Sequence, residues 1–295
     1  MSENEIAALR ALLASRPPRP ASVEGRRERM DALGEVYRIA EDIRLEPVSA
    51  DGVPAEWSVA PSAEGSRVLL YLHGGGFCAG SIVSHRAMVT EAGRAARART
   101  LAIDYRRPPE HPFPAALDDA LQAYLWLLGR GVQPERIAIG GDSAGGGLTV
   151  AVMVSLRERG LPLPACGWCL SPWVDMEARG ESYATKAAID PMINKEYILE
   201  LAGWYLGGKA PRTPLAAPLY ADLKGLPPLL IQVGSAETML DDSIQIAARA
   251  GAADVRVTLE VWPNMIHVWP LFYQQLADGH RALATAGSFI RAATG

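Results

Sequence analysis

A serine near the middle of the chain has the surroundings of a nucleophile. Residues 141–145 read GDSAG, which matches the G-x-S-x-G pattern that holds a serine on a sharp turn between a strand and a helix. The run 136–139 before it is typical of a buried strand, and the run 146–156 after it is small and apolar, as a helix buried against a sheet must be. We therefore expect Ser143 to attack a carbonyl carbon in an acyl-transfer reaction.

A glycine-rich loop is placed to stabilise the charge that such an attack creates. Residues 73–77 read HGGGF and follow another apolar, strand-like run. The negative oxygen of a tetrahedral intermediate is bound by backbone N–H groups, and glycine lets the chain approach closely enough. The expected donors are the N–H groups of Gly75, Gly76 and Ala144. We expect His73 to hold the loop by hydrogen bonds rather than to act as a base.

One of the five histidines has both the position and the context of a general base. The serine, acid and histidine are expected in that order along a chain of this pattern. Residues 255–261 alternate as a strand does, and 263–267 form a loop after it. His267 lies on that loop, where a mobile base is expected.

The acid that orients this histidine is expected to be Glu237. It lies in the first turn after the apolar run 228–233, a position that suits a residue holding an imidazole. Asp241 and Asp242 follow about one helical turn later and are the alternatives. They also suit a structural role, because carboxylates are favoured near a helix N-terminus.

Strand-like and helix-like runs alternate along the chain. Strands are expected at 43–49, 54–60, 66–72, 99–104, 136–140, 165–170, 228–233 and 255–261. This alternation predicts an α/β fold with a doubly wound, mostly parallel sheet. Right-handed crossovers then bring the loops that carry Ser143, Glu237 and His267 to the carboxyl ends of the strands, along one edge.

Together these motifs resemble those of the hormone-sensitive-lipase-like esterases, the bacterial HGGG family within the α/β-hydrolase fold. The resemblance covers roughly residues 35–290 and is carried by 73–77, 104–106, 109–116, 141–146, 190–191 and 264–267. Within the family, the chain is similar to the branch of small-ester hydrolases and monoterpene ε-lactone hydrolases. The family's acid is usually Asp in an Asp-Pro-Leu stretch, whereas Glu237, Thr238 and Met239 stand at that position here. Glutamate can also orient a histidine.

The resemblance implies about eight strands and a helical cap over the site. The expected parts are N-terminal cap helices in 1–42, a catalytic core in 43–180 and 218–295, and a cap insertion in 181–217. Such a cap would exclude water and shape an apolar acyl pocket. Phe77, Trp204 and Tyr205 are the expected substrate contacts, while packing of the cap onto the core is the alternative for the two cap residues.

These expectations combine into a serine carboxylesterase that acts through an acyl-enzyme and needs no metal or organic cofactor. A preference for short- to medium-chain acyl esters is implied by the resemblance. A lactone hydrolase that uses the same triad is an alternative, so the expected partner is a small ester or lactone. A non-catalytic ligand receptor of this fold, as in plant gibberellin receptors, is a remote alternative, because His267 is retained.

The composition agrees with an ordinary globular enzyme. The chain has 295 residues, 49% apolar and 21% charged, and a net charge of −4, which gives no reason to expect nucleic acid or an anionic membrane as a partner. No apolar run reaches the ~18 residues that span a bilayer, and no apolar signal core starts the chain, so we expect a cytoplasmic protein. The three cysteines do not suggest a disulfide framework. An edge strand near 255–261 also allows a homodimer.

Overall fold

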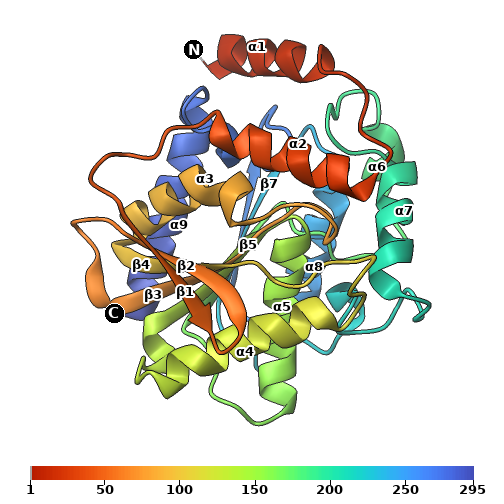
Figure 1. Cartoon of the computed structure of the whole chain (residues 1–295). Coiled ribbons are helices and arrows are strands. Elements are labelled where there is room, and N and C mark those ends of the chain that lie inside the picture. Colours follow the sequence, from red (N-terminus) through yellow and green to blue (C-terminus); the bar gives the residue numbers. More distant parts are fainter. Residues whose placement is uncertain (1) are drawn as a thin grey trace.

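A computed structural model describes residues 2–295 and contains an eight-stranded sheet (Figure 1). Its strands are β1 (Arg44–Ala50), β2 (Val53–Val59), β3 (Glu64–Leu72), β4 (Ala98–Ile103), β5 (Ile137–Asp142), β6 (Cys166–Leu170), β7 (Leu229–Gly234) and β8 (Val257–Trp262). The spatial order is β1-β2-β4-β3-β5-β6-β7-β8. The β1–β2 and β2–β4 pairs are antiparallel and the other pairs are parallel. The predicted α/β class with a mostly parallel sheet is confirmed.

Helices cover both faces of this sheet, so the sheet is doubly wound. The helices are α1 (Ser2–Ala14), α2 (Val23–Glu35), α3 (Ile82–Ala96), α4 (Ala115–Gly129), α5 (Ala144–Glu158), α6 (Ser182–Thr185), α7 (Lys195–Leu206), α8 (Leu240–Ala252) and α9 (Ala277–Thr294). Two apolar cores result, one against α4, α5 and α8 and the other against α3 and α9. Figure 1 shows α3 and α9 together on one side of the sheet, with α4 and α5 on the other.

The central strand β3 shows why the apolar runs are continuous. Each of residues 68–72 is at most 1% exposed. Val68, Leu70 and Leu72 belong to the core beneath α4 and α5, whereas Leu69 and Tyr71 belong to the core beneath α3 and α9. A parallel strand covered on both faces needs apolar side chains at every position.

Above the carboxyl ends of the parallel strands lies a cap, by which we mean residues 2–35 and 191–206. It comes from two distant parts of the sequence, and Figure 1 shows α2 and α7 side by side. The Arg26 guanidinium on α2 donates two hydrogen bonds, of 3.1 and 3.0 Å, to the Glu200 carboxylate on α7. The helix α7 begins where the Asn194 side chain accepts the Tyr197 N–H at 2.9 Å, and it ends at Gly207, which is left-handed with φ 54°. The assignment of cap and core as separate parts stays a prediction.

Two surface properties bear on partners. Strand β8 forms one edge of the sheet, and its Leu259 and Val261 side chains are 36% and 43% exposed. Pairing of this edge with a second copy stays a prediction. Within residues 2–295, no helix combines the length and the apolar character needed to cross a membrane.

Candidate active site

Ser143 occupies a sharp turn between β5 and α5. Its backbone has φ 52° and ψ −120°, a conformation that L-residues adopt only at a cost in free energy. The turn is tight because glycines flank it. A Cβ atom on Gly145 would lie 1.9 Å from the Leu72 carbonyl oxygen, and one on Gly141 would lie 2.4 Å from the Gly145 carbonyl oxygen. Side chains at these two positions are therefore excluded.

The structure brings the predicted serine, histidine and glutamate into one hydrogen-bonded row. The Ser143 Oγ lies 3.0 Å from the His267 Nε2, and the His267 Nδ1 lies 2.6 Å from the Glu237 Oε2. The three residues follow β5, β8 and β7 at the carboxyl edge of the sheet. They are 5%, 3% and 0% exposed, respectively, so bulk water competes little for these hydrogen bonds.

The electrostatics of the row favour a basic imidazole. Burial alone would lower the pKa of His267, but the charge and the hydrogen bond of Glu237 outweigh burial and raise it above the usual 6.5. Because the Glu237 carboxylate accepts a hydrogen bond from the His267 Nδ1, that nitrogen carries the proton. The Nε2 atom is then free to accept the proton of the Ser143 hydroxyl.

Glu237 is fixed at its other oxygen by a residue that the sequence did not single out. The Glu237 Oε1 accepts the Gly234 N–H at 2.7 Å and the Ser171 hydroxyl at 2.8 Å. The Ser171 Oγ in turn accepts the Val268 N–H at 3.2 Å, next to the histidine. Ser171 thus joins the acid to the histidine loop. In the sequence, its position just after the strand β6 could have indicated that it lies near the site.

The two alternative acids lie in other hydrogen-bond networks. The Asp241 carboxylate accepts the Ser182 N–H at 2.9 Å. The Asp242 carboxylate accepts the N–H groups of Val174 and Asp175, each at 3.0 Å. Burial raises the pKa of Asp242 to about 7. Neither carboxylate contacts the histidine in the part of the chain that is described.

The glycine loop has a backbone that side chains would not permit. Gly75 and Gly76 have φ angles of 103° and 62°. A Cβ on Gly75 would lie 2.4 Å from the Ala79 carbonyl oxygen, and one on Gly76 would lie 2.2 Å from the Leu201 Cδ1. Ala144 is the first residue of α5, so its N–H lies at the positive end of that helix.

Asp142 connects the glycine loop to the turn that carries the serine. Its Oδ1 accepts the Gly74 N–H at 3.0 Å and the Tyr71 hydroxyl at 2.8 Å, and its Oδ2 lies 3.2 Å from the His85 Nε2. Burial alone would raise the pKa of Asp142, but the charge of His85 and these hydrogen bonds outweigh burial and lower it. The same pairing raises the pKa of His85 against the effect of burial. His85 was not singled out in the sequence, where nothing sets it beside the serine motif.

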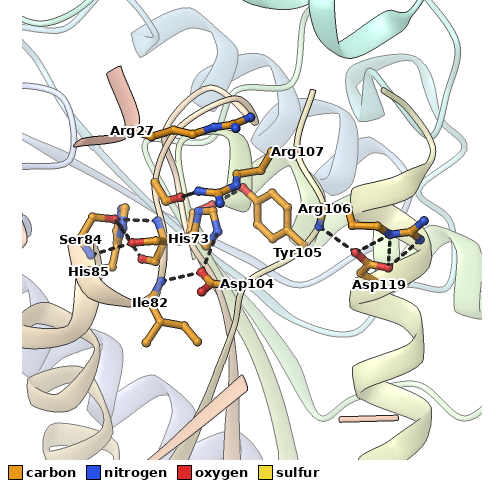
Figure 2. A network of polar contacts seen from close by, with 12 residues as sticks. Arg27, His73, Ile82, Ser84, His85, Asp104, Tyr105, Arg106, Arg107 and Asp119 are labelled. Atoms are coloured by element: carbon orange, nitrogen blue, oxygen red, sulfur yellow. Dashed lines mark hydrogen bonds and ion pairs between the residues drawn. The ribbon is translucent and has the colours of Figure 1, made fainter. Parts of the chain in front are cut away.

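His73 holds the loop from behind, as predicted for a structural role. Figure 2 shows its ring beside that of Tyr105, and the two stack with centroids 4.1 Å apart. The His73 Nδ1 donates to the Gly74 carbonyl oxygen at 2.8 Å, and the Tyr105 hydroxyl donates to the His73 carbonyl oxygen at 2.7 Å. Burial, helped by the charge of His85, lowers the pKa of His73 to about 3. A neutral, hydrogen-bonded imidazole of this kind is a scaffold group.

A cavity of about 350 Å³ opens above the serine. Its floor includes Gly75, Gly76, Ser143 and His267, and its remaining wall is formed largely by the cap. The large apolar side chains that the cap contributes to the wall are Leu13, Met30, Leu33, Met192, Ile193, Ile198 and Leu201. A small chamber with many apolar side chains in its wall therefore lies over the reacting hydroxyl.

The three side chains expected to touch substrate are not on this cavity wall. Phe77 and Tyr205 stack on each other with centroids 3.6 Å apart, and each is 1% exposed. The Arg26 guanidinium carbon lies over Trp204, 4.9 Å from the centroid of the indole ring. These contacts match the alternative of cap packing for Trp204 and Tyr205, and Phe77 packs with them. Substrate contact by Phe77, Trp204 and Tyr205 stays a prediction.

Asp190 links the cap to the acid. Its Oδ1 accepts the N–H groups of Met192 and Ile193 at 2.8 and 3.0 Å. Its Oδ2 accepts the N–H and the hydroxyl of Thr238 at 2.8 and 3.0 Å. Met192 and Ile193 line the cavity, and Thr238 follows Glu237. The cavity wall and the acid are thus tied to the same carboxylate.

No cluster of three or more His, Cys, Asp or Glu side chains placed to hold a metal occurs among residues 2–295. The cysteines are buried thiols, and burial raises the pKa of Cys166 and of Cys169 to about 12. Such thiols are poor nucleophiles and poor metal ligands at neutral pH.

Comparisons with known proteins give consistent results. Residues 69–271 match a family model described as alpha/beta hydrolase fold. The chain is 46% identical over 272 residues to an acetyl-hydrolase of Streptomyces hygroscopicus, covering 88% of this chain and 91% of the relative. It is 34% identical over 283 residues to a putative acetyl-hydrolase, LipR, of Mycobacterium tuberculosis, covering 96% and 90%. A crystal structure of an esterase from the bacterial hormone-sensitive lipase family is 50% identical and superposes with a TM-score of 0.95 over 99% of this chain and 98% of that one.

Replacing the acid tests its contact with the histidine. We expect Glu237→Gln to lower kcat for an activated ester by about 10³- to 10⁴-fold, because the amide no longer stabilises the imidazolium. Asp241→Asn, which removes the same charge nearby, is the matched control and should retain most of the activity. The measurement is steady-state kinetics of both variants, with circular dichroism to verify that they are folded. Near-normal turnover of Glu237→Gln would contradict the assignment.

The raised pKa of His267 predicts the acid limb of the pH profile. The base must be neutral to accept the serine proton, so kcat/KM should fall as the pH drops through a value above 6.5. Glu237→Gln removes the charge that raises this pKa, so its residual activity should show the limb at lower pH. An identical limb in both proteins would mean that another group controls it.

Ser171 is expected to act as a positioning residue. Ser171→Ala leaves the Glu237 Oε1 with one fewer donor and frees the histidine loop, so kcat should fall about tenfold to a hundredfold. Because the freed carboxylate holds the imidazole less well, the acid limb should also shift. Ser171→Thr, which keeps the hydroxyl, is expected to recover part of the activity. An unchanged kcat in folded Ser171→Ala would refute this role.

Proposed function

The chain belongs to the hormone-sensitive-lipase-like esterases of the alpha/beta hydrolase fold and is a carboxylic ester hydrolase, and we propose that it is a serine carboxylesterase for short- to medium-chain acyl esters. The proposal depends above all on the continuous row of Ser143, His267 and Glu237, with contacts of 3.0 and 2.6 Å. A hydroxyl, an imidazole and a carboxylate in this order form the usual arrangement for activating a serine.

In the first half of the proposed reaction, the His267 Nε2 takes the proton of the Ser143 hydroxyl as the Oγ attacks the ester carbonyl carbon. Glu237 stabilises the resulting imidazolium. The carbonyl oxygen becomes an oxyanion and accepts hydrogen bonds from the N–H groups of Gly75, Gly76 and Ala144. When the intermediate collapses, His267 gives its proton to the leaving alcohol and an acyl-serine is left.

In the second half, water takes the place of the alcohol. His267 removes a proton from this water, which attacks the acyl carbon, and the same oxyanion donors act again. Collapse of the second intermediate returns the proton to the Ser143 Oγ and releases the carboxylic acid. Apart from the ester and water, the reacting and stabilising groups of both halves are side chains and backbone N–H groups of the protein.

The size of the cavity supports the acyl-chain range. Its volume of about 350 Å³ is at the lower end of the roughly 300–1,000 Å³ of ligand pockets. Apolar cap residues such as Leu13, Met30 and Leu201 line it, which suits a short alkyl chain. A palmitoyl chain would have to extend past the cap into solvent. The part in solvent is not buried and therefore contributes nothing to binding.

The test is hydrolysis of 4-nitrophenyl acetate, butyrate, octanoate and palmitate by the wild type and by Ser143→Ala. We expect turnover of the shorter esters, little turnover of palmitate, and a loss of about 10⁴-fold or more in kcat for the variant. Mass spectrometry after treatment with a fluorophosphonate should find the label on Ser143. Hydrolysis that persists in Ser143→Ala would overturn the serine mechanism, and an optimum at palmitate would overturn the chain-length range.

A further inference from the structure

The cap side of the cavity carries an unusual concentration of positive charge. Four arginines line it: Arg16, Arg19, Arg26 and Arg29. Arg26 and Arg29 lie on α2, and Arg16 and Arg19 lie in the segment between α1 and α2, which also contributes Pro17 and Pro20 to the same wall. Of the four, only Arg26 forms an ion pair with a carboxylate of residues 2–295, and its partner is Glu200.

Two of these arginines have structural partners. The Arg19 guanidinium lies 3.2 Å above the centre of the Tyr197 ring and donates to the Met192 carbonyl oxygen at 2.7 Å. Arg26 pairs with Glu200 and lies over Trp204. Both therefore join the N-terminal part of the cap to α7, and this role explains their presence without a ligand.

Arg16 and Arg29 have no carboxylate partner among residues 2–295. Arg29 donates to the carbonyl oxygens of Pro17 and Pro18 at 2.8 and 2.9 Å, and the Arg16 side chain makes no hydrogen bond or ion pair within residues 2–295. Arg16 is half-buried, and its burial together with the charge of Arg29 lowers its pKa. Two like charges held close together at a partly buried site cost free energy unless an anion lies between or beside them.

The remaining wall of the cavity does not supply that anion. Its one carboxylate is Asp142, which lies on the floor and is already paired with His85. The histidines of the wall are His85, which is the partner of Asp142, and His267, whose partner Glu237 lies behind it and is fully buried. The cavity thus has its reacting hydroxyl at the floor and unpaired guanidinium groups at the cap.

We propose that Arg16 and Arg29 bind an anionic group of the substrate, so that the preferred esters carry a carboxylate or a phosphate remote from the scissile carbonyl. This inference rests on the proposed serine-esterase function and names its substrate class. A guanidinium presents a planar fork of N–H donors that matches either oxyanion, and it keeps its charge at neutral pH. The anion would replace the missing carboxylate partners when the substrate is bound.

The experiment compares esters that differ only in charge. On the alcohol side the probes are 4-acetoxybenzoate, 4-acetoxyphenyl phosphate and the neutral 4-acetoxybenzamide. On the acyl side they are the mono-4-nitrophenyl ester of adipic acid and neutral 4-nitrophenyl hexanoate. The readout is the ratio of kcat/KM for the anionic probe to kcat/KM for its neutral partner, measured at low and at high salt.

We expect this ratio to fall about fivefold in Arg16→Gln, further in Arg16→Glu, and to fall with added salt in the wild type. Arg29→Lys keeps the charge but loses the planar fork of N–H donors, so its kcat/KM ratio should lie between those of the wild type and Arg29→Gln. Arg159→Gln is the matched control for a lost positive charge. Arg159 follows α5 at the end away from Ser143 and is exposed, so both members of each pair should be affected equally.

The outcomes separate this inference from the proposed function. A reduced ratio for carboxylates alone, or for the phosphate alone, supports the inference and identifies the group. Ratios that no Arg16 or Arg29 variant changes more than Arg159→Gln does would overturn it, while hydrolysis of the neutral probes that requires Ser143 leaves the serine esterase intact. If Arg29→Gln does not fold, the two Arg16 variants decide alone, because the Arg16 side chain makes no hydrogen bond or ion pair within residues 2–295 that the substitution would remove.

Discussion

The close approach of α5 to the end of β3 is the constraint on which the site depends. The Gly145 Cα lies so near the Leu72 carbonyl oxygen that no side chain fits between them. This contact forces the chain into the positive-φ turn at Ser143 and sets the helix N-terminus beside the loop that continues from β3. The nucleophile and the glycine loop are therefore neighbours because of one backbone contact, and Asp142 then joins them by accepting the Gly74 N–H.

Two buried carboxylate–imidazole pairs flank this turn and have different consequences. His267 and Glu237 form one pair, and His85 and Asp142 form the other. Each carboxylate raises the pKa of its histidine against the effect of burial. Only the His267 imidazole contacts Ser143, so its basicity serves the proton transfer. The second pair stabilises the negative charge of Asp142, which is 1% exposed and can then hold the loop although it is largely removed from water.

The sequence predicted those parts of the site that depend on local pattern. Ser143 and the loop 73–77 lie in short motifs beside strong strand signals, and chain order indicated His267. Glu237 and Asp241 are only four positions apart, and the choice between them followed from how soon each comes after β7. Most of the fold was predictable for the same reason, since β3 and β5 are continuous apolar runs.

The parts that the sequence did not reveal depend on contacts between distant segments. Ser171 reaches Glu237 across 66 positions, and His85 reaches Asp142 across 57. A serine after a strand and a histidine in a helix carry no local signal for such contacts. The cavity wall is a similar case, because aromatic side chains near a site suggest substrate contact, yet Tyr205 is buried against Phe77.

The cap and the floor have different roles in the site. The floor residues are fixed by strand ends and by backbone contacts that tolerate no side chain, so changes there alter the chemistry itself. The cap wall comes from α1, α2 and α7, whose mutual contacts are side-chain pairs such as Arg26 with Glu200. Side chains on such a wall can be exchanged without moving Ser143. A charge such as Arg16, whose side chain has no hydrogen bond or ion pair within residues 2–295, can therefore set which esters are preferred while the reaction stays the same.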